Sequence, residues 1–421
     1  MKTVLKWGKE EIFLSVPDRN VLAVLEPSGG EPVADLAAEV ARLVKHPTAG
    51  PSLEEIVAAN KAKTAAIIVN DMTRSTPTAE MLPPLLEELE RLGVPSSGIA
   101  VVVATGTHRP MSDDETRQTV GDAVFAKYRV ENHDCDSPDL VDMGTLSTGN
   151  RLMINRTVAE ADLRLAIGEV LLHYYAGFAG GRKSILPGVS GRETVMTNHR
   201  MMTAPGVGIG VVDGNVLSEE MVEAVRDFCP LHFIFNCVSD SSKHIVRVVC
   251  GHWYDAWREG IVTFRKFNFA PIAQKADVVF LSAGGFPKDI NMYQAHKALY
   301  MASRAVRPGG TLVFFAELAE GYGHKVFEEW AKRRLGIDGA IEAFEADFRF
   351  GAHKLYYLAR LAKECTILLY SRSGREDSEL MFCEKAESLA DILPSLAEKY
   401  GENFTSYVIP QGGIVLPMED A

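Results

Sequence analysis

Short apolar runs recur along the chain, and each is followed by turn-forming or polar residues. The first half of the chain contains three of these runs: Ala65–Val69, Ile99–Ala104 and Leu163–Ile167. Continuous apolar runs of this length, bounded by turn residues, are typical of strands covered on both faces. Between the first two runs, Thr78–Leu92 has the length and the flanking signals of a helix. The pattern therefore predicts parallel strands that alternate with helices.

The second half repeats the pattern with three more predicted strands: Asp277–Ser282, Thr311–Ala316 and Thr366–Tyr370. The segment Phe267–Ala273 is a plausible boundary. We therefore predict an α/β protein of two domains with mostly parallel sheets flanked by helices. Residues 1–270 would form an N-terminal domain and residues 271–421 a C-terminal α/β domain. The tail Tyr407–Leu416 is strand-like, and we expect the last residues to pack against either half.

Composition narrows the class of protein. Of 421 residues, 47% are hydrophobic and 24% charged, which is typical of a globular chain. The net charge of −12 lacks the basic footprint of a general nucleic-acid-binding protein. The six cysteines form no CxxC pair, so neither a zinc ribbon nor a dense disulfide framework is expected. The sequence shows no signal peptide and no long apolar run, so we expect a cytoplasmic protein that does not bind membranes.

Reactive side chains gather directly after the predicted strands. In open α/β sheets, ligands bind outside the carboxyl ends of the strands. The segments at those ends are Asp71–Arg74, Thr105–Arg109, Gly168-Glu169 with the nearby His173, and Gly284–Asp289. Four polar or glycine-rich loops at strand ends favour a common ligand site.

The segment from His173 to His199 holds five glycines beside Arg182 and Lys183. Glycine-rich backbone next to cationic side chains forms a concavity for anions. Two interpretations stay open. The segment could be a phosphate-binding loop, although Arg182 stands where that motif requires glycine. Alternatively, Lys183 could attach a cofactor covalently and His199 could bind a metal together with ligands from elsewhere.

Taken together, these motifs resemble the nickel-dependent lactate racemase family. The matching segments are Asp71–Arg74, Thr105–Arg109, His173–His199, Pro287–Lys297 and, more weakly, Glu320–Gly323. They follow the order of the family and cover most of the chain.

The resemblance implies a nickel-pincer nucleotide, a mononucleotide of pyridinium-3-thioamide-5-thiocarboxylic acid in which two sulfurs and a ring carbon grip Ni(II). It implies that Lys183 holds this cofactor covalently through a thioamide and that His199 completes the nickel coordination. A further set is expected to let the backbone approach the nucleotide: Thr105, Gly106, Gly180 and Gly181.

By the same resemblance, His108 and His173 correspond to two acid/base histidines. The carbon-bound hydrogen of a 2-hydroxy acid is too weakly acidic for simple proton abstraction at neutral pH, and its removal as hydride avoids a carbanion. The planar 2-oxo acid that results has lost its handedness. One base is then needed for each hand, and an imidazole with a pKa of about 6.5 serves as acid or base.

The substrate site implied by the resemblance is lined by Asp71, Arg74, Tyr293, Gln294 and Lys297. An arginine can bind the substrate carboxylate with two hydrogen bonds. Tyr293 and Lys297 would share one face of a helix because they are four residues apart. Ser75 departs from the proline expected in many relatives, and the segment Ala352–Tyr357 has no clear counterpart.

We therefore predict a racemase or epimerase of a small 2-hydroxy acid, with its active site in the cleft between the domains. Proteins that build the cofactor would be its partners, because nothing in this chain resembles an enzyme that makes it. Two other functions stay open: a phosphate- or nucleotide-binding enzyme that uses the Lys183 loop, and a non-catalytic carrier of the nickel nucleotide.

Overall fold

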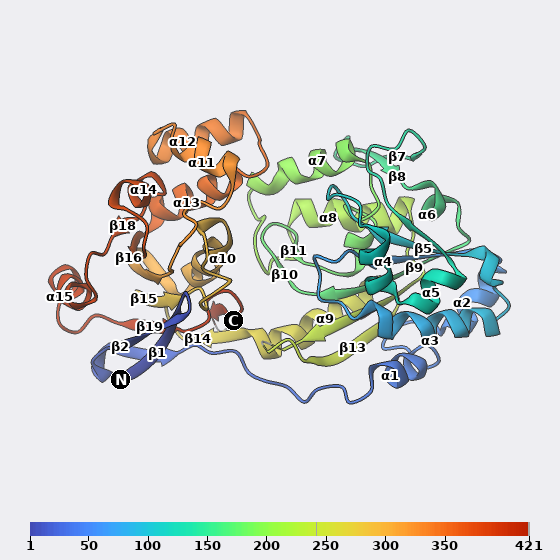
Figure 1. Cartoon of the computed structure of the whole chain (residues 1–421), viewed down its shortest axis with the longest axis horizontal. Helices are drawn as coiled ribbons and strands as arrows, with labels where there is room; N and C mark the ends of the chain where they lie inside the picture. Colours follow the sequence, from blue (N-terminus) through green and yellow to red (C-terminus); the bar gives the residue numbers. More distant parts are fainter. Residues whose placement is uncertain (241, 420–421) are drawn as a thin grey trace. The chain divides into compact units, whose positions relative to one another are not determined.

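The computed structural model describes residues 1–240 and 242–419, and it divides the chain into two compact units (Figure 1). The central unit is Gly29–Phe267. The terminal unit contains both ends of the chain, Met1–Ser28 and Asn268–Ala421. Each unit is built around its own six-stranded sheet.

In the central unit the strand order is β13-β12-β9-β4-β5-β6, and only the β12–β13 pair is antiparallel. The strands are β4 (Ala65–Asn70), β5 (Ile99–Ala104), β6 (Arg129–Asn132), β9 (Leu163–Val170), β12 (Phe233–Ser239) and β13 (Ile245–Gly251). Three predicted strands thus coincide with β4, β5 and β9. Their residues are almost entirely buried, as continuous apolar runs require.

Helices cover this sheet. They are α1 (Leu36–Leu43), α2 (Leu53–Asn60), α3 (Thr78–Arg91), α4 (Asp113–Val120), α5 (Asp122–Lys127), α6 (Arg156–Glu160), α7 (Arg192–Arg200), α8 (Val216–Glu223) and α9 (Trp253–Asn268). Helix α3 is the one predicted from the sequence, and its buried leucines join the apolar cluster of β4, β5 and β9. Two small hairpins complete the unit: β7 (Val141–Thr145) with β8 (Arg151–Ile154), and β10 (Leu172–His173) with β11 (Gly177–Phe178).

The register brings three strand ends together. Val69 of β4 lies opposite Ile167 of β9 on one side and Val103 of β5 on the other. Because all three strands are parallel, the loops after them leave from one edge of the sheet. The clustering of polar strand ends that the sequence predicted is therefore confirmed for these three loops.

The terminal unit has a fully parallel sheet of order β18-β17-β16-β15-β19-β3. The strands are β3 (Val21–Val24), β15 (Ala276–Ser282), β16 (Val306–Phe315), β17 (Thr366–Tyr370), β18 (Glu384–Lys385) and β19 (Ser406–Ile409). Its helices are α10 (Met292–Ala302), α11 (Lys325–Ala331), α12 (Gly336–Ala346), α13 (His353–Glu364), α14 (Arg375–Leu380) and α15 (Leu389–Tyr400). A hairpin of β1 (Lys2–Trp7) and β2 (Glu10–Ser15) and a pair of β14 (Phe269–Ile272) and β20 (Leu416–Glu419) lie outside the sheet.

The two units differ from the predicted division at residues 270/271 in one respect. The break falls at Phe267/Asn268, but Met1–Ser28 groups with the C-terminal half instead of with residues 29–267. The physical reason is strand pairing and packing: β3 extends the sheet beside β19, and Leu5 and Ile12 join the apolar core of β15 and β16. The tail stays in the same unit, because β20 pairs with β14.

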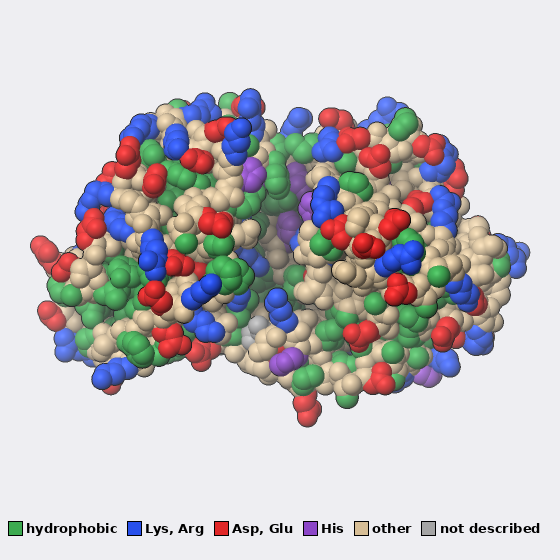
Figure 2. Space-filling model, viewed as in Figure 1, with side chains coloured by type: hydrophobic (Ala, Val, Ile, Leu, Met, Phe, Trp, Pro, Cys, Tyr) green, Lys and Arg blue, Asp and Glu red, His purple; other side chains and the backbone are tan. Residues whose placement is uncertain are grey.

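Across the described residues, no helix combines the length and the apolar character needed to cross a membrane. Figure 2 shows acidic and basic side chains interspersed over both units on the face drawn.

Candidate functional site

The loops after β4 and β5 hold a carboxylate and an imidazole in contact. Asp71 is 6% exposed, and its Oδ2 lies 2.6 Å from Nδ1 of His108. Its Oδ1 accepts hydrogen bonds from the hydroxyl and the backbone N–H of Thr73. Burial alone would raise the pKa of Asp71, but the hydrogen bonds from His108 and Thr73 outweigh it and lower that pKa. Asp71 thus stays ionised and fixes the ring of His108, whose side chain is 52% exposed.

The glycine-rich segment after β9 is shaped by close backbone approaches. Gly177 has φ +71°, and a Cβ there would lie 1.9 Å from the carbonyl oxygen of Val211. Gly180 has φ +83°, and a Cβ there would lie 2.7 Å from Oδ1 of Asn236. That same oxygen accepts the N–H of Gly181 at 2.9 Å. Only glycine fits at the first two positions, and the turn they make leads directly into the 3-10 helix Gly181–Ser184.

Arg182 faces the interior of its own loop. It is fully buried, with hydrogen bonds to the carbonyl oxygens of Ala176 and Phe178 and to the hydroxyl of Ser218. Its guanidinium lies 3.9 Å from the ring centroid of Trp257. Burial lowers the pKa of Arg182 to about 9. A side chain used in this way stabilises the loop and leaves its donors turned from solvent, which counts against a phosphate clamp made by Arg182.

Lys183 lies beside this buried cation. Burial lowers the pKa of its amine well below the ordinary value, and the charges of Arg74 and Arg182 lower it further. A lowered pKa favours the neutral, nucleophilic form of an amine.

Two of the predicted histidines are linked through a tyrosine. Tyr175 makes edge contacts with His173, at 4.5 Å between ring centroids, and with His199, at 4.9 Å. His199 is 8% exposed, and its Nδ1 lies 3.2 Å from Oδ1 of Asn198. Burial, with the charge of Lys183, lowers the pKa of His199 to about 3. The ring is therefore neutral, and when Nδ1 donates to Asn198 the lone pair is on Nε2.

His173 has a different hydrogen bond. Its Nδ1 accepts the N–H of Ala176 at 3.3 Å, so the neutral ring carries its proton on Nε2. Burial lowers the pKa of His173 well below the ordinary value, and nearby groups add to the effect when they carry positive charge: Lys183, His199, Arg74 and Arg182. These electrostatic couplings bring together in the central unit five residues that the sequence singled out, and Arg74 and Arg182 supply positive charge there.

Thr105 and Gly106 join the loop after β5 to the Lys183 segment. The N–H of Gly106 donates to the carbonyl oxygen of Gly188 at 3.0 Å. The hydroxyl of Thr105 donates to the carbonyl oxygen of His133 at 2.6 Å, so it is already used inside the protein. Both residues thus support the arrangement of the two loops.

The other substrate-lining candidates belong to the terminal unit. Tyr293, Gln294 and Lys297 lie on α10, with Tyr293 and Lys297 four residues apart as expected. The ring of Tyr293 stacks on His324 at 4.7 Å, and the amine of Lys354 lies 5.1 Å from its centroid. Lys354 is 6% exposed, and burial, with the charge of Lys297, lowers its pKa to about 7.

Sequence reasoning missed Tyr175, Asn198 and Lys354. Tyr175 and Asn198 are adjacent to predicted site residues, but their roles depend on which way a side chain turns. Lys354 falls in the segment that had no counterpart, and a buried lysine has no sequence signal.

A metal site made by this chain alone is not found among the described residues around His199. The one cluster of three potential ligands within residues 1–240 and 242–419 is Asp134, Cys135 and Asp136, and Asp136 forms an ion pair with Arg192. A metal on His199 would therefore need other ligands that do not come from a cluster of the described side chains around it.

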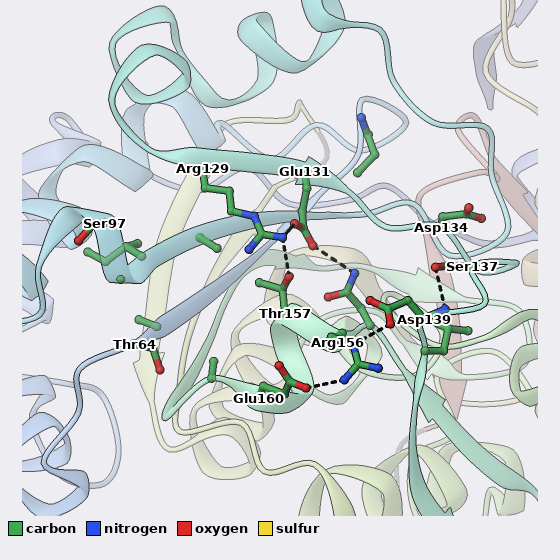
Figure 3. Close-up of a pocket in the computed structure, with 18 residues that line it drawn as sticks. Thr64, Ser97, Arg129, Glu131, Asp134, Ser137, Asp139, Arg156, Thr157 and Glu160 are labelled. Carbon is green, nitrogen blue, oxygen red and sulfur yellow. Dashed lines mark hydrogen bonds and ion pairs between the residues drawn. The ribbon is translucent and has the colours of Figure 1, made fainter.

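The cavity of about 570 Å³ in the central unit lies elsewhere (Figure 3). It is lined by the amino-terminal ends of β4 and β5, with Ala65 and Ile99, opposite to the ends that carry Asp71 and Thr105. Its cations are already paired: Arg129 with Glu131, and Arg156 with Asp139 and Glu160. This cavity is not part of the candidate site.

Comparisons with known proteins agree with these motifs. A model of the lactate racemase N-terminal domain matches residues 7–210, and one of the lactate racemase C-terminal domain matches residues 272–416. The lactate racemase of Thermoanaerobacterium thermosaccharolyticum is 32% identical over 99% of both chains. That of Lactiplantibacillus plantarum is 31% identical over 77% of this chain and 76% of the relative. The apoprotein structure from T. thermosaccharolyticum superposes with a TM-score of 0.87 at 28% identity, covering 100% of each chain.

Proposed function

The chain belongs to the lactate racemase family and is an isomerase of the racemase type, and on that premise we propose that it interconverts the enantiomers of a small 2-hydroxy acid with a nickel-pincer nucleotide carried on Lys183. Lactate is the first candidate because both relatives are named for it. The observation that supports the proposal is the place of Lys183, directly after the tight turn at Gly180 and Gly181 and within electrostatic reach of the buried His199, where the pKa of its amine is lowered.

The residues around Lys183 fit the proposed group. Covalent attachment needs an uncharged amine, and the burial of Lys183 beside Arg74 and Arg182 favours that form. An anionic nucleotide would be favoured by the positive charges of Arg74 and Arg182 in the same region. Glycine is required at position 180, because a Cβ there would collide with the side chain of Asn236.

His199 would complete the nickel coordination through Nε2. Its hydrogen bond with Asn198 orients the ring, as partners behind a ligating histidine commonly do. Asn198 is itself held by the carbonyl oxygen of Leu217 and the carboxylate of Glu220. The chemistry that the bound nickel nucleotide supplies is reversible acceptance of hydride from the carbon that bears the hydroxyl.

Proton transfer would belong to two histidines. When Nδ1 of His108 donates to Asp71, Nε2 has the lone pair that accepts the proton of a substrate hydroxyl. Asp71 stabilises the imidazolium that results. Formation of the other enantiomer would need a proton delivered to the new hydroxyl oxygen from the opposite side, and His173 would give it from Nε2 as an imidazolium, which the loss of that proton returns to the neutral ring. For the opposite enantiomer the two histidines exchange roles.

Arg74 would bind the substrate carboxylate. Its side chain is exposed on the loop after β4, and a guanidinium binds a carboxylate with two parallel hydrogen bonds. The assignment of Tyr293, Gln294 and Lys297 to the substrate stays a prediction.

The test is racemisation by protein produced in cells that also make the cofactor. Single enantiomers of lactate and of larger 2-hydroxy acids are incubated with the loaded protein and separated by chiral chromatography. We expect one substrate to reach an equal mixture of enantiomers, and protein from cells without the cofactor pathway to be inactive. Nucleotide hydrolysis that is indifferent to nickel, with no racemisation of any acid tested, would contradict the proposal.

A further inference from the structure

A buried carboxylate occupies the end of strand β9. Side chains alternate along a strand, so Leu163, Leu165, Ile167 and Glu169 share one face. The three apolar residues belong to the core beneath α3. Glu169 is the fourth of the series and is only 3% exposed. A carboxylate in such a place needs hydrogen-bond donors or a positive charge nearby, because burying an unpaired charge is unfavourable.

The hydrogen-bond donors come from the loop that joins β4 to α3. The hydroxyl of Ser75 donates to Oε2 of Glu169 at 3.3 Å, and the backbone N–H of Ser75 also donates to this carboxylate. Oε1 is buried and has no hydrogen-bond partner among the described residues. Burial raises the pKa of Glu169, and the largest effect that opposes it is the charge of Arg74.

The same loop is held at two other points. The N–H of Arg74 donates to the carbonyl oxygen of Asp71 at 3.1 Å. Asn70 donates from Nδ2 to the hydroxyl of Thr76 at 2.8 Å. Hydrogen bonds therefore hold the loop on both sides of the Arg74 side chain. One joins its backbone to Asp71, and the other joins Ser75 to Glu169.

We propose that Glu169 is a positioning residue for Arg74: through its hydrogen bond with Ser75 it anchors the loop directly after Arg74 and so holds that residue in its place at the substrate site. The inference rests on the proposed function, in which Arg74 binds the substrate carboxylate. Glu169 itself does not contact substrate in this account.

Two features favour positioning over simple packing. An apolar residue would continue the series of Leu163, Leu165 and Ile167 without any cost of burying a charge. In addition, Ser75 contributes both of its donors to the same carboxylate, and a residue without a backbone N–H, such as proline, could not do so. Hydrogen bonds from Ser75 to one buried carboxylate define the direction of the loop as well as its stability.

The test compares Ser75→Ala, Ser75→Thr and Glu169→Gln in loaded protein. Ser75→Ala and Glu169→Gln should raise KM for the hydroxy acid about tenfold and change kcat less than about twofold, because binding of the carboxylate is lost and the reacting groups are untouched. Ser75→Thr keeps both donors and should restore KM. The matched control is Ser147→Ala, which removes a hydrogen bond of the same kind, from Ser147 to Glu223 in the same unit, and should leave KM unchanged.

A second readout does not need activity. Hydrogen exchange of the Asn70–Thr76 segment should be faster in Glu169→Gln than in wild type, because the N–H of Ser75 loses its charged acceptor. Unchanged KM together with unchanged exchange would overturn the inference. So would equal losses of kcat in the Ser75 variants and in the Ser147 control.

Arg74→Ala separates this inference from the proposed function. If Arg74→Ala raises KM and adding Glu169→Gln raises it no further, both stand. If Arg74→Ala raises KM but Glu169→Gln adds an independent effect, the inference fails alone. If Arg74→Ala leaves KM unchanged, the proposed role of Arg74 fails, and the positioning role of Glu169 fails with it.

Discussion

His108 and His173 follow β5 and β9, the two strands that flank β4 in one sheet, yet the structure surrounds them in opposite ways. His108 is half exposed, and a buried carboxylate holds its Nδ1. His173 packs against Tyr175, accepts a backbone N–H at Nδ1, and lies among cations that lower its pKa. When Nδ1 of His108 donates to Asp71, the lone pair of that ring is on Nε2, whereas the backbone N–H of Ala176 at Nδ1 of His173 places the proton of the second ring on Nε2.

The difference shows that residue type alone does not define a proton-transfer group. The two rings differ because a carboxylate lies beside His108, whereas Lys183, Arg74 and Arg182 lie near His173. A bound anion would compensate the charges around His173, whereas the Asp71–His108 pair is complete within the protein.

The largest effect should come from Lys183, which lies near His173. Lys183→Ala removes the amine to which the cofactor would be attached, so racemisation should fall below detection and the adduct should be absent from the intact-protein mass. Lys127→Ala, which removes an exposed lysine paired with Glu90, is the matched control and should keep both. Racemase activity in Lys183→Ala would break the account.

The two histidines can be separated by the handedness of the substrate. His108→Ala and His173→Ala should each lower racemisation by about 10²–10⁴-fold, because each removes one acid/base group. In a single turnover, each variant should form the 2-oxo acid from only one enantiomer, and the two variants should differ in which one. Nickel content equal to wild type shows that loading persists. If both variants lose the same enantiomer, the assignment of one histidine to each hand is wrong.

A smaller effect should follow from changing the partner of His108 and leaving the ring in place. Asp71→Asn keeps the shape but offers an N–H₂ group that favours the other tautomer, so kcat should fall by about 10²–10³-fold with little change in nickel content. His173 has no such carboxylate partner in the described part of the chain. A variant with wild-type kcat would mean that the Asp71 contact is structural only.

The smallest effect concerns stability of the cofactor-free protein. Folding depresses the pKa of Lys183, so the unfolded chain binds more protons at neutral pH and stability rises with pH toward the ordinary lysine value. Lys183→Met should therefore raise the free energy of unfolding at pH 7. The gain should shrink as pH approaches about 10. Thermal unfolding at several pH values measures it; Lys127→Met should show no such gain, and a gain independent of pH would exclude titration as its cause.

Much of the sheet architecture follows from local pattern. Strands β4, β5, β9 and β15 are short apolar runs that end in turn residues, and this signal survives because both faces of such strands are buried. The place of Met1–Ser28 could not be predicted in the same way. Its strand β3 pairs with β19, hundreds of residues away, and no local pattern encodes a partner at that distance.

The candidate site shows the same distinction between features set by local sequence and features set by three-dimensional packing. Loops at strand ends and an unusual glycine-rich segment pointed to Asp71, His108 and Lys183. The roles of Tyr175, Asn198 and Glu169 depend on which buried groups their side chains meet, and only three-dimensional packing defines those contacts. The different surroundings of His108 and His173 likewise depend on three-dimensional packing.

The proposed function depends most directly on attachment of the cofactor to the amine of Lys183. The direct measurement is a peptide map, by mass spectrometry, of active protein from cells that make the nickel nucleotide. The account predicts the adduct on the peptide that contains Lys183. Full activity with that lysine unmodified, or with the adduct attached to a different residue, would contradict it.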